Sequence, residues 1–147
     1  MVDIGEKEVV RRKAVATGKI VLGKASIDAI RSGTVKKGDV LEAAKIAAIQ
    51  AVKSTPDIVP YCHPIPVESI RVGFDVAEGS LTCHVEVNAH YKTGVEMEAL
   101  IGVSVALLTV WDMVKYLEKD RKGQYPDTSI TDIRVVSKEK GGITLGI

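Results

Sequence analysis

The amino-acid sequence predicts an α+β fold in which helices cover one face of an antiparallel sheet. Two long segments have helical periodicity behind polar start signals, and two alternating segments joined by a short turn are typical of a hairpin. Further alternating segments lie near both ends of the chain. In sequence order the elements are β-α-α-β-β-α-β, which is the order of a ferredoxin-like split βαβ domain.

The first strand is predicted over residues 8–22, where apolar residues such as Val15 and Ile20 alternate with polar ones. Gly18 marks a position where this strand could bend. The consecutive basic residues 11–13 favour a solvated sheet edge, which discourages pairing between edges, over a contact with phosphate.

Two helices are predicted between the first strand and the hairpin. A short one over residues 24–31 should end at Ser32 and Gly33. The second starts where Asp39 and Glu42 have the spacing of a capping box, ahead of a long apolar segment. Lys37 precedes that start, where backbone N–H groups favour an anionic ligand, although a lysine in a surface turn is usually only solvated.

The segment Thr55–His63, TPDIVPYCH, predicts one helical turn with Thr55 as its N-cap and Pro56 in its first turn, ending before Pro60. His63 then lies in extended, rigid backbone because a proline follows it. A histidine held in this way can direct its ring at a ligand. A single histidine beside a cysteine is nevertheless more often a packed or surface residue.

The hairpin is predicted over residues 67–76 and 81–92, with a turn at 77–80. One face of its second strand is apolar, whereas the other carries polar residues and histidines and should be either solvated or part of an interface. A zinc site built from the Cys-His dipeptides at 62–63 and 83–84 is disfavoured, because adjacent strand residues point to opposite faces.

The most informative segment is Thr93–Lys119, TGVEMEALIGVSVALLTVWDMVKYLEK. Thr93 and Glu96 have capping-box spacing, which predicts a helix start. Residues 99–111 are apolar on nearly every side of that helix, yet the run is shorter than the about 20 residues that span a bilayer. We therefore expect the sheet and another subunit to cover it.

Charged residues flank this apolar run. Glu98 and Asp112 fall on one stripe of the helix but are 14 residues apart, or about 21 Å along an unbroken helix. Lys115 follows Asp112 by three residues, so that each can shift the pKa of the other. Because one small pocket in a single subunit cannot easily use both carboxylates, a pocket at a subunit boundary is the simplest expectation.

The remaining sequence is a polar loop at 120–128, a final strand at 130–136 and an expected flexible tail at 137–147. Residues 1–147 should form a single domain, since a chain of this length buries roughly 68–70% of its unfolded surface.

Composition narrows the functional classes. Lys and Arg number 20 against 19 Asp and Glu, a balance that favours neither nucleic-acid nor membrane-surface binding. The charged N-terminus lacks the apolar core of a signal peptide. Cys62 and Cys83 are isolated, which suits free thiols in a reducing cytoplasm better than a disulfide framework, although a pair between them stays open.

Four motifs together resemble the cyclic pyranopterin monophosphate synthase family of molybdenum cofactor biosynthesis. They are MVDIGEKEVVRRKAVATG, KGDVLEAAKIAAIQAVKST, VPYCHPIPV and GVEMEALIGVSVALLTVWDMVK. The resemblance implies a lyase that converts (8S)-3′,8-cyclo-7,8-dihydroguanosine 5′-triphosphate to cyclic pyranopterin monophosphate and diphosphate. It also implies a homohexamer, a trimer of dimers of ferredoxin-like subunits, with the site at a subunit interface.

The resemblance further implies roles for residues within these motifs. Asp112 and Lys115 in WDMVK match the family's catalytic pair, and Lys37 in KKGD matches its essential lysine. The substrate-binding positions correspond to Tyr61, Cys62, His63, Glu96, Met97 and Glu98. No metal ligand or cofactor is implied by the sequence, although Mg²⁺ could accompany the triphosphate.

Most of these residues also have a structural interpretation. Glu96 suits a capping box, Glu98 suits the helix dipole and Met97 suits core packing. Asp112 lacks such an alternative, because a carboxylate in the late turns of a helix gains nothing from the dipole. From the residues alone, a non-catalytic module that binds a nucleotide or pterin and a purely structural oligomer stay open as alternatives.

Overall fold

The computed structural model describes residues 1–141 and 143–145. The elements in chain order are β1 (Val10–Val21), α1 (Lys24–Ser32), α2 (Val40–Lys53), α3 (Thr55–Ile58), β2 (Val67–Val76), β3 (Ser80–Tyr91), α4 (Glu96–Glu118), β4 (Ser129–Lys140) and β5 (Ile143–Leu145). The element order predicted from the sequence is confirmed, with the short helix α3, expected as a single helical turn, and the strand β5 in addition.

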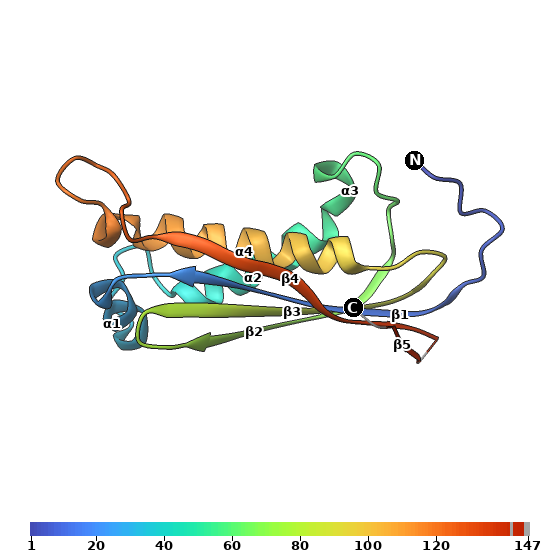
Figure 1. The fold of residues 1–147 in the computed structure, drawn as a ribbon, viewed down its shortest axis with the longest axis horizontal. Helices are drawn as coiled ribbons and strands as arrows, with labels where there is room; N and C mark the ends of the chain where they lie inside the picture. The colour runs from blue at the N-terminus through green and yellow to red at the C-terminus, as the bar shows by residue number, and fades with distance from the viewer. Residues whose placement is uncertain (142, 146–147) are drawn as a thin grey trace.

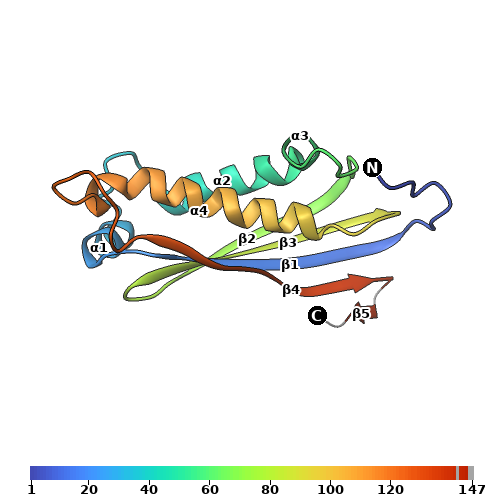
Figure 2. The ribbon, with the colours of Figure 1, turned by 45° about the horizontal axis from the view of Figure 1, so that its top comes forward.

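The strands form one five-stranded sheet in the order β2-β3-β1-β4-β5. All neighbouring strands are antiparallel, and β1 pairs along its whole length with β3, from Val10 opposite Tyr91 to Val21 opposite Ser80. Helices α2 and α4 lie on the same face of this sheet, and α1 lies at one end (Figures 1 and 2). The predicted α+β class with an antiparallel sheet is therefore confirmed.

The two central strands alternate as a sheet with one covered face requires. In β1 the residues at even positions from Arg12 to Ile20 are buried, and in β3 those at odd positions from Leu81 to Ala89 are buried. These side chains face α2 and α4, whereas their neighbours along each strand stand on the open face. The core thus lies between the sheet and the two long helices.

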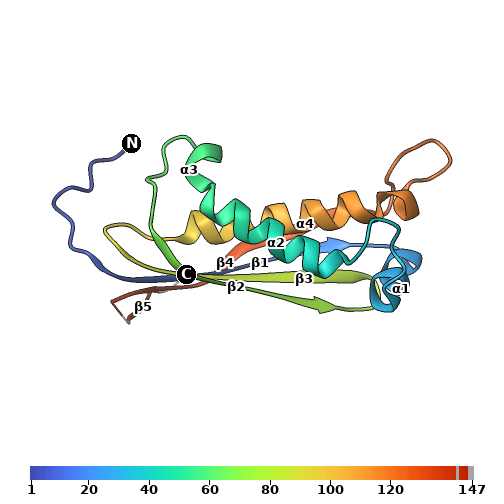
Figure 3. The same ribbon diagram turned by 180° about the vertical axis from the view of Figure 1, so that it is seen from behind.

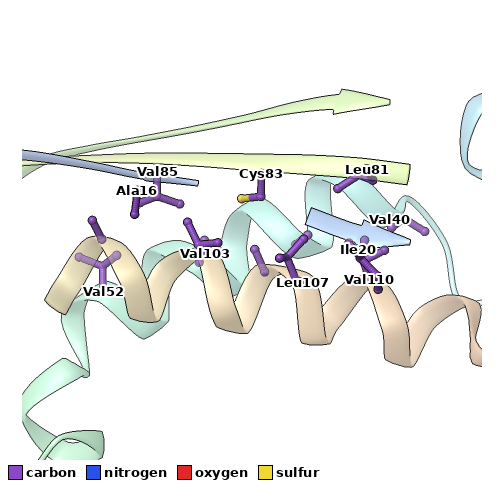
Figure 4. Close-up of a cluster of buried hydrophobic side chains, with 14 of the residues drawn as sticks. Ala16, Ile20, Val40, Val52, Leu81, Cys83, Val85, Val103, Leu107 and Val110 are labelled. Carbon is purple, nitrogen blue, oxygen red and sulfur yellow. The ribbon is translucent and has the colours of Figure 1, made fainter. Parts of the chain in front are cut away.

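Helix α4 packs closely against the sheet and against α2. Val103, Leu107 and Val110 are fully buried between the helix and the strands (Figure 4). A methyl group added at Gly18 of β1 would stand 2.6 Å from Val103 Cγ1, and one added at Gly102 of α4 would stand 2.9 Å from a methyl of α2. Glycine at both positions therefore permits the close packing of helix on sheet.

By length and hydropathy α4 could cross a membrane, but half of its most apolar 18-residue stretch is buried within the structure. This packing is typical of the central helix of a folded domain. Leu108 is the main exception, because 56% of it is exposed.

The C-terminal end of α4 is hydrogen-bonded to the start of α1 through one carboxylate. Glu118 accepts hydrogen bonds from the Gly23 backbone N–H at 3.0 Å, from the Ser26 hydroxyl and from the Thr128 hydroxyl at 2.6 Å. A carboxylate at the start of a helix also suits the helix dipole. The last turn of α4, the start of α1 and the end of the 120–128 loop are thereby held together.

Two of the predicted helix caps are wrong. The first residue of α4 is Glu96, its N-cap is Val95, and no side chain caps it, so Thr93 does not form the expected capping box. Thr55 does not cap α3 either, because its hydroxyl donates to two carbonyls at the end of α2. The Asp39 cap of α2 is confirmed, since its carboxylate accepts from the Glu42 backbone N–H at 3.1 Å.

The flexible tail predicted over 137–147 is wrong for its first four residues. Residues 137–140 continue β4 and pair with residues 12–15 of β1. Residues 143–145 form β5, which pairs with the end of β4. Of the other four positions of the predicted tail, Gly141 is in a turn, and residues 142, 146 and 147 lie outside the described residues.

Replacing Gly18 with alanine should lower the free energy of unfolding by about 1–3 kcal/mol, because the new methyl group overpacks the contact with α4. Urea denaturation at fixed protein concentration measures this change. Gly73→Ala is a matched control in β2, where a methyl group would meet nothing within 4 Å, and it should stabilise by about 0.5–1 kcal/mol. Equal midpoints for the two variants would contradict the proposed packing.

Candidate functional site

Three predicted site residues meet near the C-terminal end of α4, in a group called here the Asp112 cluster (Lys37, Asp112 and Lys115). The Lys37 ammonium lies 2.8 Å from Asp112 Oδ2 and 3.2 Å from the Asp112 carbonyl oxygen. The Lys115 ammonium lies 3.2 Å from Asp112 Oδ1. Each carboxylate oxygen therefore has its own cation, and two positive charges stand around one negative charge.

The cluster is open to solvent, since the Asp112 side chain is 58% exposed. Its hydrogen bonds to Lys37 and then to Lys115 hold the pKa of the Asp112 carboxyl below its ordinary value. Asp112 is thus ionised over the whole neutral range. The two lysines leave the cluster with a net positive charge, which suits an anionic ligand.

The six predicted substrate-binding residues lie at the other end of α4, in what is called here the Glu98 pocket. Its volume is about 310 Å³. The predicted residues that line it are Tyr61, Cys62, His63, Glu96, Met97 and Glu98. The turn after α3 and the residue that follows it supply the first three, and the first turn of α4 supplies the others. Two separate motifs of the sequence thus form one concave surface.

Glu98 is the buried acid of this pocket, with only 2% of its surface exposed. Burial raises the pKa of its carboxyl, and the charge of Glu96 adds to the effect, against one hydrogen bond from its own backbone. Burial and the same two carboxylates also raise the pKa of the neighbouring Cys62 thiol. Cys62 therefore stays a thiol at neutral pH and is not an activated nucleophile.

Glu96 has one satisfied and one unsatisfied oxygen. Its Oε1 lies 3.3 Å from the Lys138 ammonium, whereas its Oε2 is buried and has no hydrogen-bond partner among the described residues. A methyl group added at Gly94 would stand against this free oxygen. A buried acceptor without a donor is costly in a folded protein, and because this oxygen is covered beside Gly94, a ligand would reach it only after the Glu96 side chain turned.

The N-terminal arm, residues 1–9, forms a wall of the Glu98 pocket, and its position was not predicted from the sequence. Val2, Ile4 and Lys7 line the pocket, and the Lys92 ammonium donates to the Gly5 carbonyl oxygen at 3.3 Å. The arm has neither helical nor strand periodicity before β1, so pattern reasoning gave it no position. The motif in which it lies, MVDIGEKE, was the only signal in the sequence that it had a role.

Within one chain the Asp112 cluster and the Glu98 pocket do not meet. The N-terminal arm and α3 lie at one end of α4, and α1 and the 120–128 loop lie at the other (Figures 1 and 3). The two carboxylates of the predicted stripe also differ in burial, because Glu98 is enclosed and Asp112 is exposed.

The two histidines of the hairpin have carboxylate partners, and its one cysteine is buried. His84 lies 2.7 Å from Asp75 and His90 lies 2.6 Å from Glu68, on the open face of the sheet. Cys83 is buried, which raises the pKa of its thiol to about 12, and it forms no disulfide with Cys62. No group of three or more potential metal ligands occurs among the described residues.

Comparison with known proteins gives one consistent result. A family model described as the MoaC family matches residues 1–141. A Thermococcus kodakarensis protein named probable cyclic pyranopterin monophosphate synthase is 57% identical over 96% of this chain and 90% of its own length. A Methanococcoides burtonii protein of the same name is 55% identical over 98% of this chain and 91% of its own length.

The free energy of unfolding should fall less with rising pH in the Glu98→Gln variant than in the wild type. Because the folded-state pKa of Glu98 is raised, folding is favoured while this group is protonated, and that stability is lost as the pH rises through the folded pKa. Urea midpoints measured from pH 4.5 to 8 should decline less for the variant than for the wild type.

The matched control is Glu42→Gln, because Glu42 is also the third residue of its helix but is exposed. This control should keep the wild-type pH dependence. An identical pH dependence in Glu98→Gln and the wild type would contradict the assignment of Glu98 as a desolvated acid.

Proposed function

The chain belongs to the MoaC family, and on that premise we propose that it is a cyclic pyranopterin monophosphate synthase. It is a lyase of molybdenum cofactor biosynthesis that converts (8S)-3′,8-cyclo-7,8-dihydroguanosine 5′-triphosphate to cyclic pyranopterin monophosphate and diphosphate. The observation that carries the proposal is the 55–57% identity to proteins of that name over nearly the whole chain. We place the reaction in the cytoplasm, in keeping with the two free cysteines.

The Asp112 cluster is suited to the reacting end of this substrate. Ring opening and pterin closure move protons, and an ionised carboxylate such as Asp112 can accept and return them. Lys37 and Lys115 keep that carboxylate charged, and Lys37 also supplies positive charge for the phosphates. Release of diphosphate breaks the bond between the innermost phosphorus and its bridging oxygen while a hydroxyl oxygen bonds to that phosphorus, and His63 from the Glu98 pocket of another subunit would steady this step. Any Mg²⁺ would arrive with the triphosphate as part of the substrate.

The Glu98 pocket is suited to the part of the substrate derived from guanine. That ring system offers several N–H groups, and two carboxylate residues, Glu96 and Glu98, line the pocket as possible acceptors. Glu98 can donate in its protonated form and accept in its ionised form. Tyr61, Cys62 and Met97 complete the wall around a flat ring.

The two ends of α4 would meet in an assembly. We propose a homohexamer, a trimer of dimers of ferredoxin-like subunits, in which the Glu98 pocket of one subunit faces the Asp112 cluster of another. The strand order β2-β3-β1-β4 and the two crossover helices support the ferredoxin-like assignment. The separation of about 21 Å along the helix and the exposed Leu108 on it support the shared site.

Asp112→Asn should lower the turnover number by about 10²–10⁴-fold, the usual range for loss of a general acid-base group. Diphosphate release from the cyclised substrate measures it. Asp28→Asn is the control, because Asp28 is another exposed carboxylate paired with a lysine, at 2.7 Å, and it should keep full activity. Normal turnover by folded Asp112→Asn protein would rule out the catalytic role of Asp112. If the wild-type protein binds the cyclised substrate but does not turn it over, the chain is instead a non-catalytic binding module.

Two inactive variants should complement each other if the site is shared. Asp112→Asn and His63→Ala subunits, unfolded together and refolded as mixed oligomers, should recover activity at about a quarter of the sites. At those sites a His63→Ala subunit supplies the intact Asp112 and an Asp112→Asn subunit supplies the intact His63. Separately refolded variants are the controls. Mixed oligomers of the correct mass that stay inactive would show that each subunit holds its own site.

A further inference from the structure

We propose that Tyr116 is a positioning residue, which fixes the loop between α1 and α2 so that Lys37 of this loop reaches Asp112. The effect on turnover rests on the proposed function, whereas the contact itself does not. Tyr116 lies outside all the motif residues considered above. It follows Asp112 by four residues on α4, so the two side chains are neighbours on one face of the helix.

The loop that carries Lys37 is held mainly at its two ends, where the Thr34 backbone N–H donates to the Ala29 carbonyl oxygen at 3.0 Å and the Asp39 carboxylate accepts from the Glu42 backbone N–H at 3.1 Å. It consists of residues 33–39, and its glycines Gly33 and Gly38 have φ values of 69° and 118°, in the region that favours glycine. Val35 is its one buried apolar side chain. The Gly38 backbone N–H closes a turn on the Val35 carbonyl oxygen at 3.1 Å, but among the described residues no local hydrogen bond comes from the Lys36 or Lys37 backbone. The middle of the loop therefore keeps conformational freedom when contacts from outside are missing.

Tyr116 supplies such a contact at the residue before Lys37. The Lys36 backbone N–H donates to the Tyr116 hydroxyl oxygen at 3.0 Å. The Lys36 ammonium also lies 5.0 Å from the centre of the Tyr116 ring, a cation–π arrangement. One face of α4 thus holds the loop at two points, the backbone through Tyr116 and the Lys37 side chain through Asp112.

The backbone contact matters because the ion pair alone is weak. The Lys37 and Asp112 side chains are 47% and 58% exposed, and an ion pair in such a position contributes little to stability because water screens it. Such a pair does not by itself order a loop with two flexible glycines. The end of α4 that carries Tyr116 is in turn anchored to α1 by Glu118, so the support is rigid.

The test is Tyr116→Phe, which removes the hydroxyl and keeps the ring beneath Lys36. The turnover number should fall about 3–10-fold, the effect of losing one hydrogen bond, with KM changed by less than a factor of about 2. Tyr125→Phe is the matched control, because Tyr125 packs its ring against Trp111 next to the cluster. Lys36→Gln keeps the backbone donor and should lose less activity than Tyr116→Phe.

A second measurement separates positioning from general destabilisation and does not depend on catalysis. The charged groups on Asp112 are Lys37 from the loop and Lys115 from its own helix. Loosening Lys37 should raise the pKa of Asp112, because the hydrogen bond from Lys37 is the largest cause of its lowered value. Titration of the ¹³C-labelled Asp112 carboxyl by NMR should show this rise in Tyr116→Phe but not in Tyr125→Phe.

The outcomes distinguish the two proposals. An unchanged Asp112 titration in Tyr116→Phe would overturn the inference about Tyr116, whatever the activity. A raised Asp112 pKa together with normal turnover in Asp112→Asn would support the positioning contact and contradict the catalytic role of the cluster. A raised pKa with the expected loss of turnover supports both.

Discussion

The close contact of α4 with the sheet is the constraint on which the rest of the structure depends. Gly18 and Gly102 leave no side chain between helix and strands, so that Val103 and Leu107 pack directly over β1. A helix held this closely cannot rotate without exposing apolar surface or forcing clashes. Both groups of candidate residues depend on this helix, since its first turn forms part of the Glu98 pocket and its late turns carry Asp112 and Lys115.

The same helix holds two carboxylates in opposite environments. Glu98 is desolvated and its pKa is raised, whereas Asp112 is exposed and two lysines lower its pKa. Two carboxyl groups whose pKa values are moved apart can serve as acid and base at one pH. In the proposed shared site each subunit would offer one of these groups to a neighbour, so that the difference in burial along one helix becomes a difference in chemical role.

Much of this architecture could be predicted from sequence, because strand alternation and helical periodicity are local signals. The helix caps at Thr93 and Thr55 could not. Glu96 pairs with Lys138, which is 42 residues away, and the Thr55 hydroxyl donates back to the end of α2, a choice between neighbouring backbone groups that residue spacing does not decide. Residues 137–140 read as a polar tail, yet their pairing with β1 and the contact of Glu139 with Lys13 at 3.7 Å make them strand. Only long-range pairing reveals such a strand.

The position of the N-terminal arm has a practical consequence for handling the protein. Val2 and Ile4 stand on the wall of the Glu98 pocket, and Gly5 is held there by Lys92. Any affinity tag fused ahead of Met1 would therefore emerge beside the pocket, where a histidine-rich peptide could occupy it or displace the arm. Kinetic work on this chain calls for cleavable fusions and a comparison of enzyme before and after their removal.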